Sequence, residues 1–235
     1  MQQVPLIIGN GRLARHLQYY FSLLQLPFVS WYREQPLELL YKKVNDANTI
    51  LILINDDAIE PFAKQYLFTT KAKLIHCSGS LASDRIFGVH PLMTFGEDLY
   101  SEETYRSIPF VVDENAPIWE ELFPGLPNMH FRINPSNKAK YHALCVLSGN
   151  FSCMLWQKLF HDLEMELHLP ANIAYPFFKR QMQNLLNNPN AALTGPISRQ
   201  DTTTINKNLT ALVGDPFYQV YQGFINCYQK FKGNL

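Results

Sequence analysis

The sequence has no excess of charge of either sign, because twenty Lys and Arg balance twenty Asp and Glu. No net positive field is therefore available to hold a nucleic-acid backbone or an anionic membrane. No uninterrupted apolar run approaches about 18 residues, and the N-terminus lacks a basic stretch followed by an apolar signal core. These absences predict a soluble cytoplasmic protein that binds a small molecule, with no nucleic-acid partner and no membrane partner.

Cysteine is scarce, and the spacings typical of metal ligands are missing. The four cysteines stand singly without a CxxC pair, and the histidines show no paired spacing such as HxxxH. A disulfide scaffold and a metal centre are therefore not expected. The chain does have 235 residues, of which 47% are hydrophobic. That is enough to bury a core and a cofactor.

Short apolar runs alternate with amphipathic stretches in the first part of the chain, as in a parallel sheet covered by helices. The run 49–54 is apolar and β-branched enough for a central strand. The other expected strands are 4–8, 28–31, 73–77, 86–90, 108–112 and 129–132, with a first helix at 13–24. Beyond residue 137 strand-like alternation is absent, and helices are expected over 138–168, 170–186, 202–212 and 216–232.

The pattern predicts an α/β protein with two domains. Residues 1–132 are expected to form a Rossmann-type, doubly wound, mostly parallel sheet, and residues 133–235 an all-helical domain.

A glycine motif opens the chain directly after the first apolar run and directly before the first amphipathic helix. It comprises Gly9, Asn10, Gly11, Arg12, Leu13 and Ala14, which fit GxGxxA. Gly9 permits a tight turn, Gly11 lets the backbone approach a pyrophosphate, and the small Ala14 allows close packing of helix on strand. The motif predicts that these six residues bind a dinucleotide at the helix N-terminus. The alternative is a glycine turn that binds nothing.

The end of the second strand favours NADP over NAD. An NAD enzyme usually has an acidic residue here, whereas this chain has Ser30 and then Arg33. A guanidinium pairs well with a 2′-phosphate, and the serine could add a hydrogen bond. The alternative for Arg33 is a surface arginine at a strand end.

Asn55 and Asp56 follow the third strand, at the edge of the sheet where ligands of doubly wound folds bind. Both are predicted to face the cofactor. Asp56 or Asp57 could equally cap the helix that begins near Ala58, and we prefer capping for one of them.

Four further motifs place polar residues where a Rossmann protein builds its reaction site. They are His76-Cys77-Ser78-Gly79-Ser80, Gly88-Val89-His90-Pro91-Leu92, Tyr141-His142-Ala143 with Ser148-Gly149-Asn150, and the run from Leu193-Thr194-Gly195-Pro196 to Arg199-Gln200-Asp201. With the glycine motif, these resemble, in order and nearly end to end, Rossmann-like proteins with a DUF2520 carboxyl-terminal domain. These proteins are relatives of 6-phosphogluconate dehydrogenase, ketopantoate reductase and pyrroline-5-carboxylate reductase.

The resemblance implies an NAD(P)-type domain, a helical domain that commonly mediates homodimerisation, and a cleft between them, but no particular substrate. The chain also departs from the family pattern. Gln200 stands where the TGPxxRxD motif usually has Gly, and the segment between Pro91 and Ile108 is rich in acidic and aromatic residues.

Histidine suits proton transfer near neutral pH, so His142 is our first choice as general acid or base. Asn150 follows two helical turns later, about 12 Å along the axis, and with Ser78 it is expected to orient the substrate. His90 is expected to face the same site and His76 to face the cofactor. For each lone histidine the alternative is a structural residue bonded to backbone.

The last motif supplies Arg199, which could bind a substrate carboxylate or form a structural ion pair with Asp201. Asp201 precedes Thr202-Thr203-Thr204 and is expected to cap a helix. The function predicted from these residues is hydride transfer between NADP(H) and a small carbonyl, imine or hydroxy substrate, one that could carry a carboxylate. The alternatives are a non-catalytic NADP-binding or sensing protein, and a cleft that holds another nucleotide or none.

Overall fold

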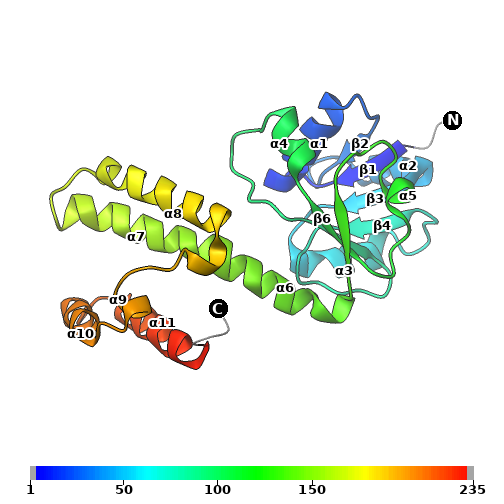
Figure 1. Cartoon of the computed structure of the whole chain (residues 1–235). Coiled ribbons are helices and arrows are strands. Elements are labelled where there is room, and N and C mark those ends of the chain that lie inside the picture. Colours follow the sequence, from blue (N-terminus) through cyan, green and yellow to red (C-terminus); the bar gives the residue numbers. More distant parts are fainter. Residues whose placement is uncertain (1–3, 232–235) are drawn as a thin grey trace. The chain divides into compact units, whose positions relative to one another are not determined.

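The computed structural model describes residues 4–231, and Figure 1 shows a sheet with helices packed on both faces. Its seven strands lie in the order β2-β1-β3-β4-β5-β6-β7, and all neighbours are parallel except β5 and β6. The strands are β1 (Val4–Ile8), β2 (Val29–Trp31), β3 (Ala47–Ile52), β4 (Lys73–His76), β5 (Phe87–Pro91), β6 (Phe110–Asp113) and β7 (His130–Ile133). The chain runs from β1 to β2 on one side and then crosses to β3 on the other. A crevice therefore opens at the carboxyl ends of β1 and β3, where doubly wound folds bind ligands.

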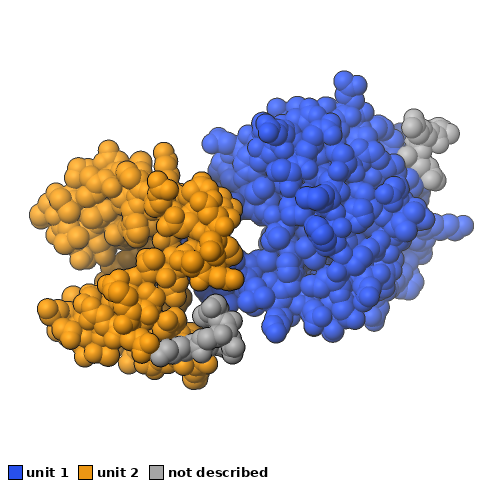
Figure 2. Space-filling model, in the orientation of Figure 1, with its two compact units in different colours: residues 1–153 blue, residues 154–235 orange. Residues whose placement is uncertain are grey.

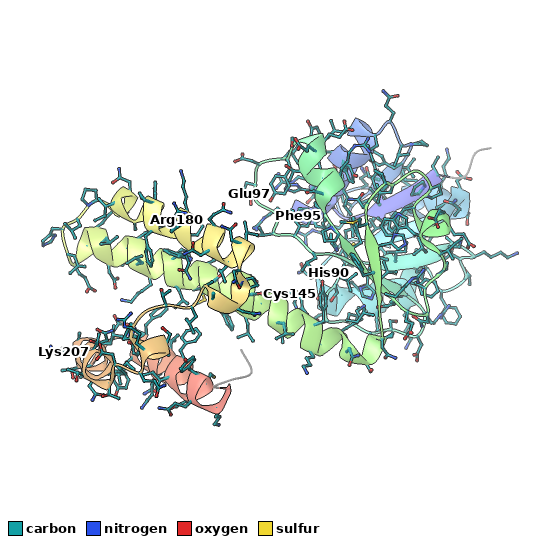
Figure 3. The ribbon with its side chains drawn as sticks, viewed as in Figure 1. His90, Phe95, Glu97, Cys145, Arg180 and Lys207 are labelled. Carbon is teal, nitrogen blue, oxygen red and sulfur yellow. The ribbon has the colours of Figure 1, made fainter. Side chains whose placement is uncertain are left out.

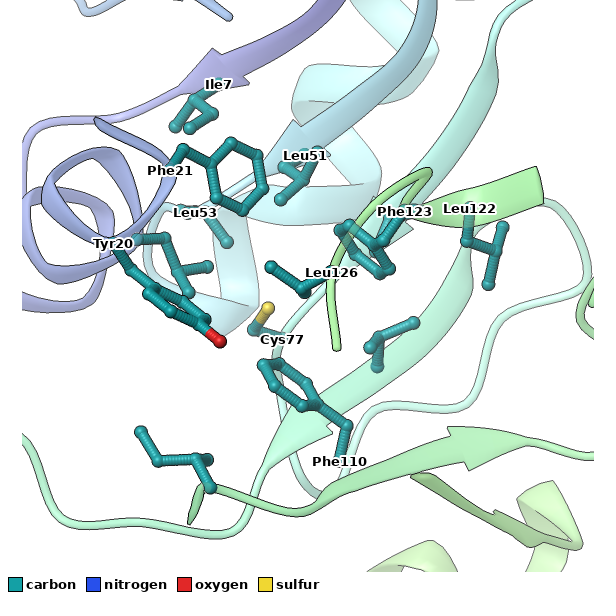
Figure 4. Close-up of a cluster of buried hydrophobic side chains, with 14 of the residues drawn as sticks. Ile7, Tyr20, Phe21, Leu51, Leu53, Cys77, Phe110, Leu122, Phe123 and Leu126 are labelled. Atoms are coloured by element: carbon teal, nitrogen blue, oxygen red, sulfur yellow. The ribbon is translucent and has the colours of Figure 1, made fainter. Parts of the chain in front are cut away.

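Helices cover this sheet because its central strands are apolar on both faces. The helices that belong with it are α1 (Arg12–Leu23), α2 (Leu37–Asp46), α3 (Asp56–Tyr66), α4 (Glu102–Ser107), α5 (Trp119–Leu122) and α6 (Lys138–Cys145). On one face Ile7 and Leu51 pack against Tyr20 and Phe21 of α1, in the cluster drawn in Figure 4. On the other face, alternate strand residues such as Ile50 pack against α2 and α3. The two-residue period of a strand produces this division of the core.

The remaining helices form a second part of the molecule. They are α7 (Ser152–Met165), α8 (Tyr175–Asn187), α9 (Pro196–Arg199), α10 (Thr202–Ala211) and α11 (Tyr218–Phe231). Within this part Trp156 packs edge-on against Phe177 and Phe178. Lys158 contacts both Asp162 and Asp215, which ties α7 to the turn before α11.

The chain separates into two compact units, residues 1–153 and 154–235, coloured separately in Figure 2. We predicted a division near residue 132, whereas α6 belongs with the sheet. Lys138, in the first turn of α6, is 2% exposed and pairs with Asp113 of β6, and this buried ion pair attaches α6 to the sheet.

The predicted fold class is confirmed, with a Rossmann-type sheet followed by helices. The single helix expected over 138–168 is interrupted by a π-helical segment, Val146–Phe151, between α6 and α7. Between residues 4 and 231, no helix combines the length and the apolar character that crossing a membrane requires.

Candidate functional site

A groove of about 740 Å³ opens at the carboxyl ends of β1, β2 and β3. The predicted cofactor residues that line it are Gly9, Asn10, Gly11, Arg12, Leu13, Ala14, Arg33, Asn55 and Asp56. Ser30 and His76 are not among the lining residues. The carbonyl of Ser30 instead accepts a hydrogen bond from the Lys43 ammonium at 2.5 Å, and His76 is buried inside the sheet. Cys77 and Ser78 complete one end of the groove.

The start of α1 has the features that a pyrophosphate requires. Gly11 is the N-cap residue, no side chain caps the helix, and its first turn carries no acidic residue. A Cβ atom at Gly11 would meet nothing within 4 Å, so the space above the helix N-terminus is open. Gly9 has φ +127°, and a Cβ there would fall on the carbonyl oxygen of Leu53. The free N–H groups and the helix dipole therefore face an open groove, which suits an anion.

A carboxylate from another part of the chain lies close to this helix start. Glu97, labelled in Figure 3, pairs with Arg12 (Nε to Oε1, 3.1 Å) and with Arg15 (Nη2 to Oε2, 2.9 Å). These arginines hold the pKa of Glu97 below its usual value. The loop that carries Glu97 is anchored by buried His16, whose Nε2 lies 3.0 Å from the carbonyl oxygen of Gly96. The acidic, aromatic segment that departs from the family pattern thus folds over α1.

Asp56 and Ser78 meet at the end of the groove, from α3 and from the turn after β4. The Ser78 hydroxyl donates a hydrogen bond to Asp56 Oδ2 and accepts one from the N–H of Leu81 at 3.1 Å. The N-cap of α3 is Asn55, and no side chain caps that helix. The prediction that Asp56 or Asp57 caps α3 is therefore wrong. Both lie in the first helical turn, where a negative charge interacts favourably with the helix dipole.

Two histidines converge on Gly79, the residue that follows Ser78. A Cβ at Gly79 would lie 3.0 Å from Cγ of His142 and 3.1 Å from Cδ2 of His90. The two imidazole rings are edge to face, with centroids 5.8 Å apart. Nδ1 of His90 lies 2.8 Å from the hydroxyl oxygen of Tyr141, the residue before His142 on α6. The absence of a side chain at position 79 lets β5 and α6 bring these rings together beside the end of the groove.

Burial keeps His76 and His90 neutral near pH 7. The pKa of His90 is lowered to about 4 by desolvation, with smaller contributions from His142 and Lys138. The pKa of His76 is lowered to about 3, again mainly by desolvation, and Lys138 and His90 lower it further. His76 Nδ1 accepts the N–H of Ser78 at 3.1 Å, and its Nε2 is buried without a hydrogen-bond partner among residues 4–231. His76 thus orients the turn that carries Ser78.

A buried ion pair lies near these histidines. Lys138 Nζ is 2.8 Å from Asp113 Oδ1, and both side chains are almost fully buried. Asp113 Oδ2 also accepts the N–H of Gly88 at 2.6 Å. A Cβ at Gly88 would approach both carboxylate oxygens to 2.8 Å. The glycine of the Gly88-Val89-His90-Pro91-Leu92 motif therefore makes room for the ion pair that joins α6 to the sheet.

Two further predicted site residues, Asn150 and Arg199, are exposed. Asn150 is exposed in the π-helical segment. Arg199 is exposed at the end of α9, in the second unit. Asp201 caps α10, accepting the N–H of Thr204 at 3.0 Å, which lowers its pKa and confirms the predicted cap.

Three residues of the cluster were not selected from the sequence: Tyr141, Asp113 and Lys138. Tyr141 adjoins His142 in the Tyr141-His142-Ala143 motif, so it could have been predicted from the sequence. Nothing local distinguishes Asp113 or Lys138, because their pairing depends on contacts between β6 and α6. Among residues 4–231, no three His, Cys, Asp or Glu side chains gather as a metal ion would need.

The doubly wound sheet, the glycine turn and the groove at its switch point define a Rossmann-type protein with a helical carboxyl-terminal part. The chain belongs to the family described as "Domain of unknown function (DUF2520)", which matches residues 109–226, just over half of the sequence. The resemblance read from the motifs is therefore confirmed. No protein of curated function matches the sequence.

Solved structures share the fold along nearly the whole chain. A candidate NADP oxidoreductase from Bacteroides fragilis is 19% identical with a TM-score of 0.77, covering 97% of this chain and 98% of its own. A protein from Thermotoga maritima is 21% identical with a TM-score of 0.71, covering 97% of each chain. A reductive aminase from Aspergillus terreus, solved with NADPH and ethyl levulinate, is 13% identical with a TM-score of 0.60, covering 95% and 88%. At these identities the likeness establishes the fold alone.

Proposed function

We propose that this protein is an NADP-dependent oxidoreductase that transfers a hydride between NADP(H) and a small carbonyl, imine or hydroxy substrate. One observation carries the proposal. An open groove above an uncapped helix N-terminus ends at Ser78, directly beside an imidazole pair at Gly79. The first part suits a dinucleotide, and the second suits proton transfer. Two of the solved structures that share this fold have NADP or NADPH in their names, which supports an NADP-dependent reaction.

When bound, the nicotinamide supplies or accepts the hydride. The N-terminus of α1 would hold the pyrophosphate, and Arg33 in the groove would pair with a 2′-phosphate. Asp56 and Ser78, already hydrogen-bonded to each other, would bind the ribose next to the reacting ring. His142 would give or take the proton at a ring nitrogen, and His90 would hold the reacting carbonyl or imine. Asn150 and Arg199 remain proposed contacts to the substrate.

The cofactor is tested by titrating the protein with NADPH and with NADH and following fluorescence. NADPH is expected to bind more tightly than NADH, and Gly11→Asp should abolish both because it places a carboxylate at the pyrophosphate site. Arg33→Ala should weaken NADPH binding by about tenfold or more while changing NADH little, since only NADPH has the 2′-phosphate. Equal losses for the two cofactors would remove Arg33 from the proposed role.

Activity is tested by NADPH oxidation over a panel of small ketones, aldehydes, cyclic imines and 2-oxo acids. With an active substrate, His142→Ala is expected to lower kcat by about a hundredfold or more and to leave NADPH affinity within about twofold. Unchanged turnover would exclude His142 as the proton-transfer group.

A second candidate is an NADP-binding or sensing protein without chemistry, favoured by the exposed position of Asn150, a predicted substrate ligand. Tight NADPH binding without turnover across the panel would favour it.

We further propose that the chain forms a homodimer through its helical unit. Among residues 154–230 only Leu163, Ala174 and Ala192 are buried. Large apolar side chains are exposed instead, among them Leu186 (80%) and Val213 (74%). A unit of this size needs far more apolar burial to be stable, and a second copy of the same surface would provide it.

A further inference from the structure

His90 and Tyr141 form a hydrogen-bonded pair across two elements, β5 and α6. The hydroxyl oxygen of Tyr141 lies 2.8 Å from Nδ1 of His90, and the two rings are edge to face at 80°. Nε2 of His90 has no hydrogen-bond partner among residues 4–231, yet it is not one of the buried unpaired atoms. One ring nitrogen is thus occupied by protein, and the other is available to a ligand.

The first unit contains a second histidine–tyrosine pair, which shows how hydrogen-bond partners determine which imidazole nitrogen carries the proton. Nδ1 of His16 lies 2.7 Å from the hydroxyl of Tyr105, and its Nε2 lies 3.0 Å from the carbonyl oxygen of Gly96. A carbonyl only accepts, so Nε2 of His16 must carry a proton, and in the tautomer with that single proton the phenol donates to Nδ1. Both nitrogens of His16 are occupied by protein, and this pair is structural.

At His90 the only protein partner within the described part of the chain is the Tyr141 hydroxyl, so the direction of the hydrogen bond depends on which group is the better donor. Burial raises the pKa of Tyr141, so its phenol keeps its proton. Burial also lowers the pKa of His90 to about 4, so its ring is neutral near pH 7 and has one acceptor nitrogen. A phenol can donate to a neutral imidazole or accept from it, but the phenol is the stronger acid and the imidazole nitrogen the stronger base. The favoured hydrogen bond therefore runs from the Tyr141 hydroxyl to Nδ1 and leaves the imidazole proton on Nε2.

The protonated nitrogen lies on the side of the ring that faces Gly79. Cδ2, which is bonded to Nε2, is the His90 atom nearest to a Cβ built on Gly79, at 3.1 Å. The ring of His142 borders the same space, and Ser78 at the end of the groove precedes it in the chain. A substrate atom next to Nε2, which is unpaired within residues 4–231, would meet an N–H from His90.

We propose that Tyr141 is a positioning residue that fixes His90 as the Nε2–H tautomer, so that His90 donates a hydrogen bond to the carbonyl oxygen or imine nitrogen of the substrate. The role toward substrate rests on the proposed oxidoreductase function, whereas the tautomer does not. His90 then polarises the acceptor and His142 moves the proton. The two histidines have different tasks although they border the same space.

The tautomer is tested by nitrogen-15 NMR of the whole protein with labelled histidine, using long-range proton–nitrogen correlations near pH 7. The His90 signals are identified by their loss in His90→Gln. We expect Nδ1 of His90 to show the shift of an unprotonated nitrogen and Nε2 that of a protonated one. In Tyr141→Phe the two His90 nitrogens should move toward averaged shifts, because the phenyl ring no longer selects one tautomer.

Tyr105→Phe is the matched control, since it removes the equivalent phenol from His16. It should move the His16 signals and leave those of His90 in place. A proton on Nδ1 of His90 in the unmodified protein would overturn the proposal. So would unchanged His90 shifts in folded Tyr141→Phe.

Kinetics test the consequence for the reaction. With an active carbonyl or imine substrate, Tyr141→Phe is expected to lower kcat about tenfold, leaving NADPH affinity within about twofold. Unchanged kcat would overturn the role of Tyr141 in the reaction. A protein inactive on every substrate but with the expected tautomer would contradict the proposed function and the role of His90 toward substrate, while upholding the tautomer itself.

Discussion

At the scale of single residues, Gly9 and Gly11 differ in what a methyl group would meet. Gly9 has φ +127°, and a Cβ there would fall on the backbone of Leu53, 2.9 Å from its carbonyl carbon. Gly11 has φ −73° and open space around it. We expect Gly9→Ala to lower the free energy of unfolding by about 2–4 kcal/mol and Gly11→Ala by less than about 1 kcal/mol. Urea unfolding measures both values, and equal losses would contradict the structure.

His76 predicts a loss of stability in acid. Its pKa in the folded protein is about 3, below the ordinary value of 6.5, so the unfolded chain binds the proton more readily. The stability that depends on neutral His76 is complete above pH 6.5 and is lost as pH falls toward 3. The free energy of unfolding should fall by up to about 1.4 kcal/mol per pH unit for this one proton.

The measurement is urea unfolding of the unmodified protein and of His76→Gln between pH 7 and pH 4.5. The variant should show a shallower dependence on pH because glutamine does not titrate, although His90, with its pKa of about 4, contributes to the slope in both proteins. Identical slopes would mean that His76 is not held neutral.

The sequence revealed residues whose role is local and missed those whose role depends on folding. Gly9 and Gly11 could be selected because a turn between strand and helix constrains its own residues. Asp201 could be selected as a cap for the same reason. The capping assignment of Asp56 or Asp57 failed, because Asn55 is the N-cap residue of α3 and Asp56 instead accepts a hydrogen bond from Ser78, in the turn after β4. Such partners are not visible in the local sequence.

At the scale of elements, the attachment of α6 to the sheet depends on the buried pair of Lys138 and Asp113. Removing one partner leaves a buried charge without compensation. We therefore expect Lys138→Met to lower the free energy of unfolding by about 3–5 kcal/mol. Lys138→Met combined with Asp113→Asn should cost less than the single change, since the amide oxygen can still accept the N–H of Gly88. A double variant less stable than Lys138→Met would contradict this account.

The loop between β5 and α4 predicts an effect on the cofactor. Glu97 pairs with Arg12, which lines the groove, and with Arg15 on the same helix. Under the proposed function this carboxylate competes with the phosphates for the guanidinium groups. Because the pairs are exposed, Glu97→Gln should raise NADPH affinity only about two- to fivefold. Glu102→Gln, which removes the partner of Arg106 on α4, is the control and should have no effect. Weaker NADPH binding by Glu97→Gln would show that Glu97 supports the site instead.

The strands and most helices could be predicted because their hydrophobic period follows from the secondary structure itself. The π-helical segment Val146–Phe151 could not, since its residues have no distinct period. Ser148 bonds to the carbonyl of Leu144 at 2.7 Å, and Ser152 bonds to that of Ser148 at 2.5 Å. These hydrogen bonds from serine hydroxyls to the backbone, together with the flexible Gly149, accompany the wider π-helical turn.

At the scale of the whole molecule, the two units are unequal in their cores. The sheet unit has apolar clusters on both faces, whereas the described helices of the second unit bury few residues. The sequence predicted helices there because the amphipathic period is local. It could not indicate what covers the apolar sides of these helices, because that depends on the surface that packs against them.

The proposed homodimer predicts that the second unit is stabilised by association. We expect the protein to sediment as a dimer at micromolar concentration, and Leu186→Glu on α8 to shift it toward monomer because a buried charge would have no partner. Leu39→Glu is the matched control, since Leu39 is also an exposed leucine (42%) but lies on α2 of the sheet unit. The control should remain dimeric. A monomeric unmodified protein, or dissociation by both variants alike, would contradict association through the helical unit. Thermal unfolding adds a second criterion, because a dimer stabilised by mass action should melt at higher temperature as its concentration rises.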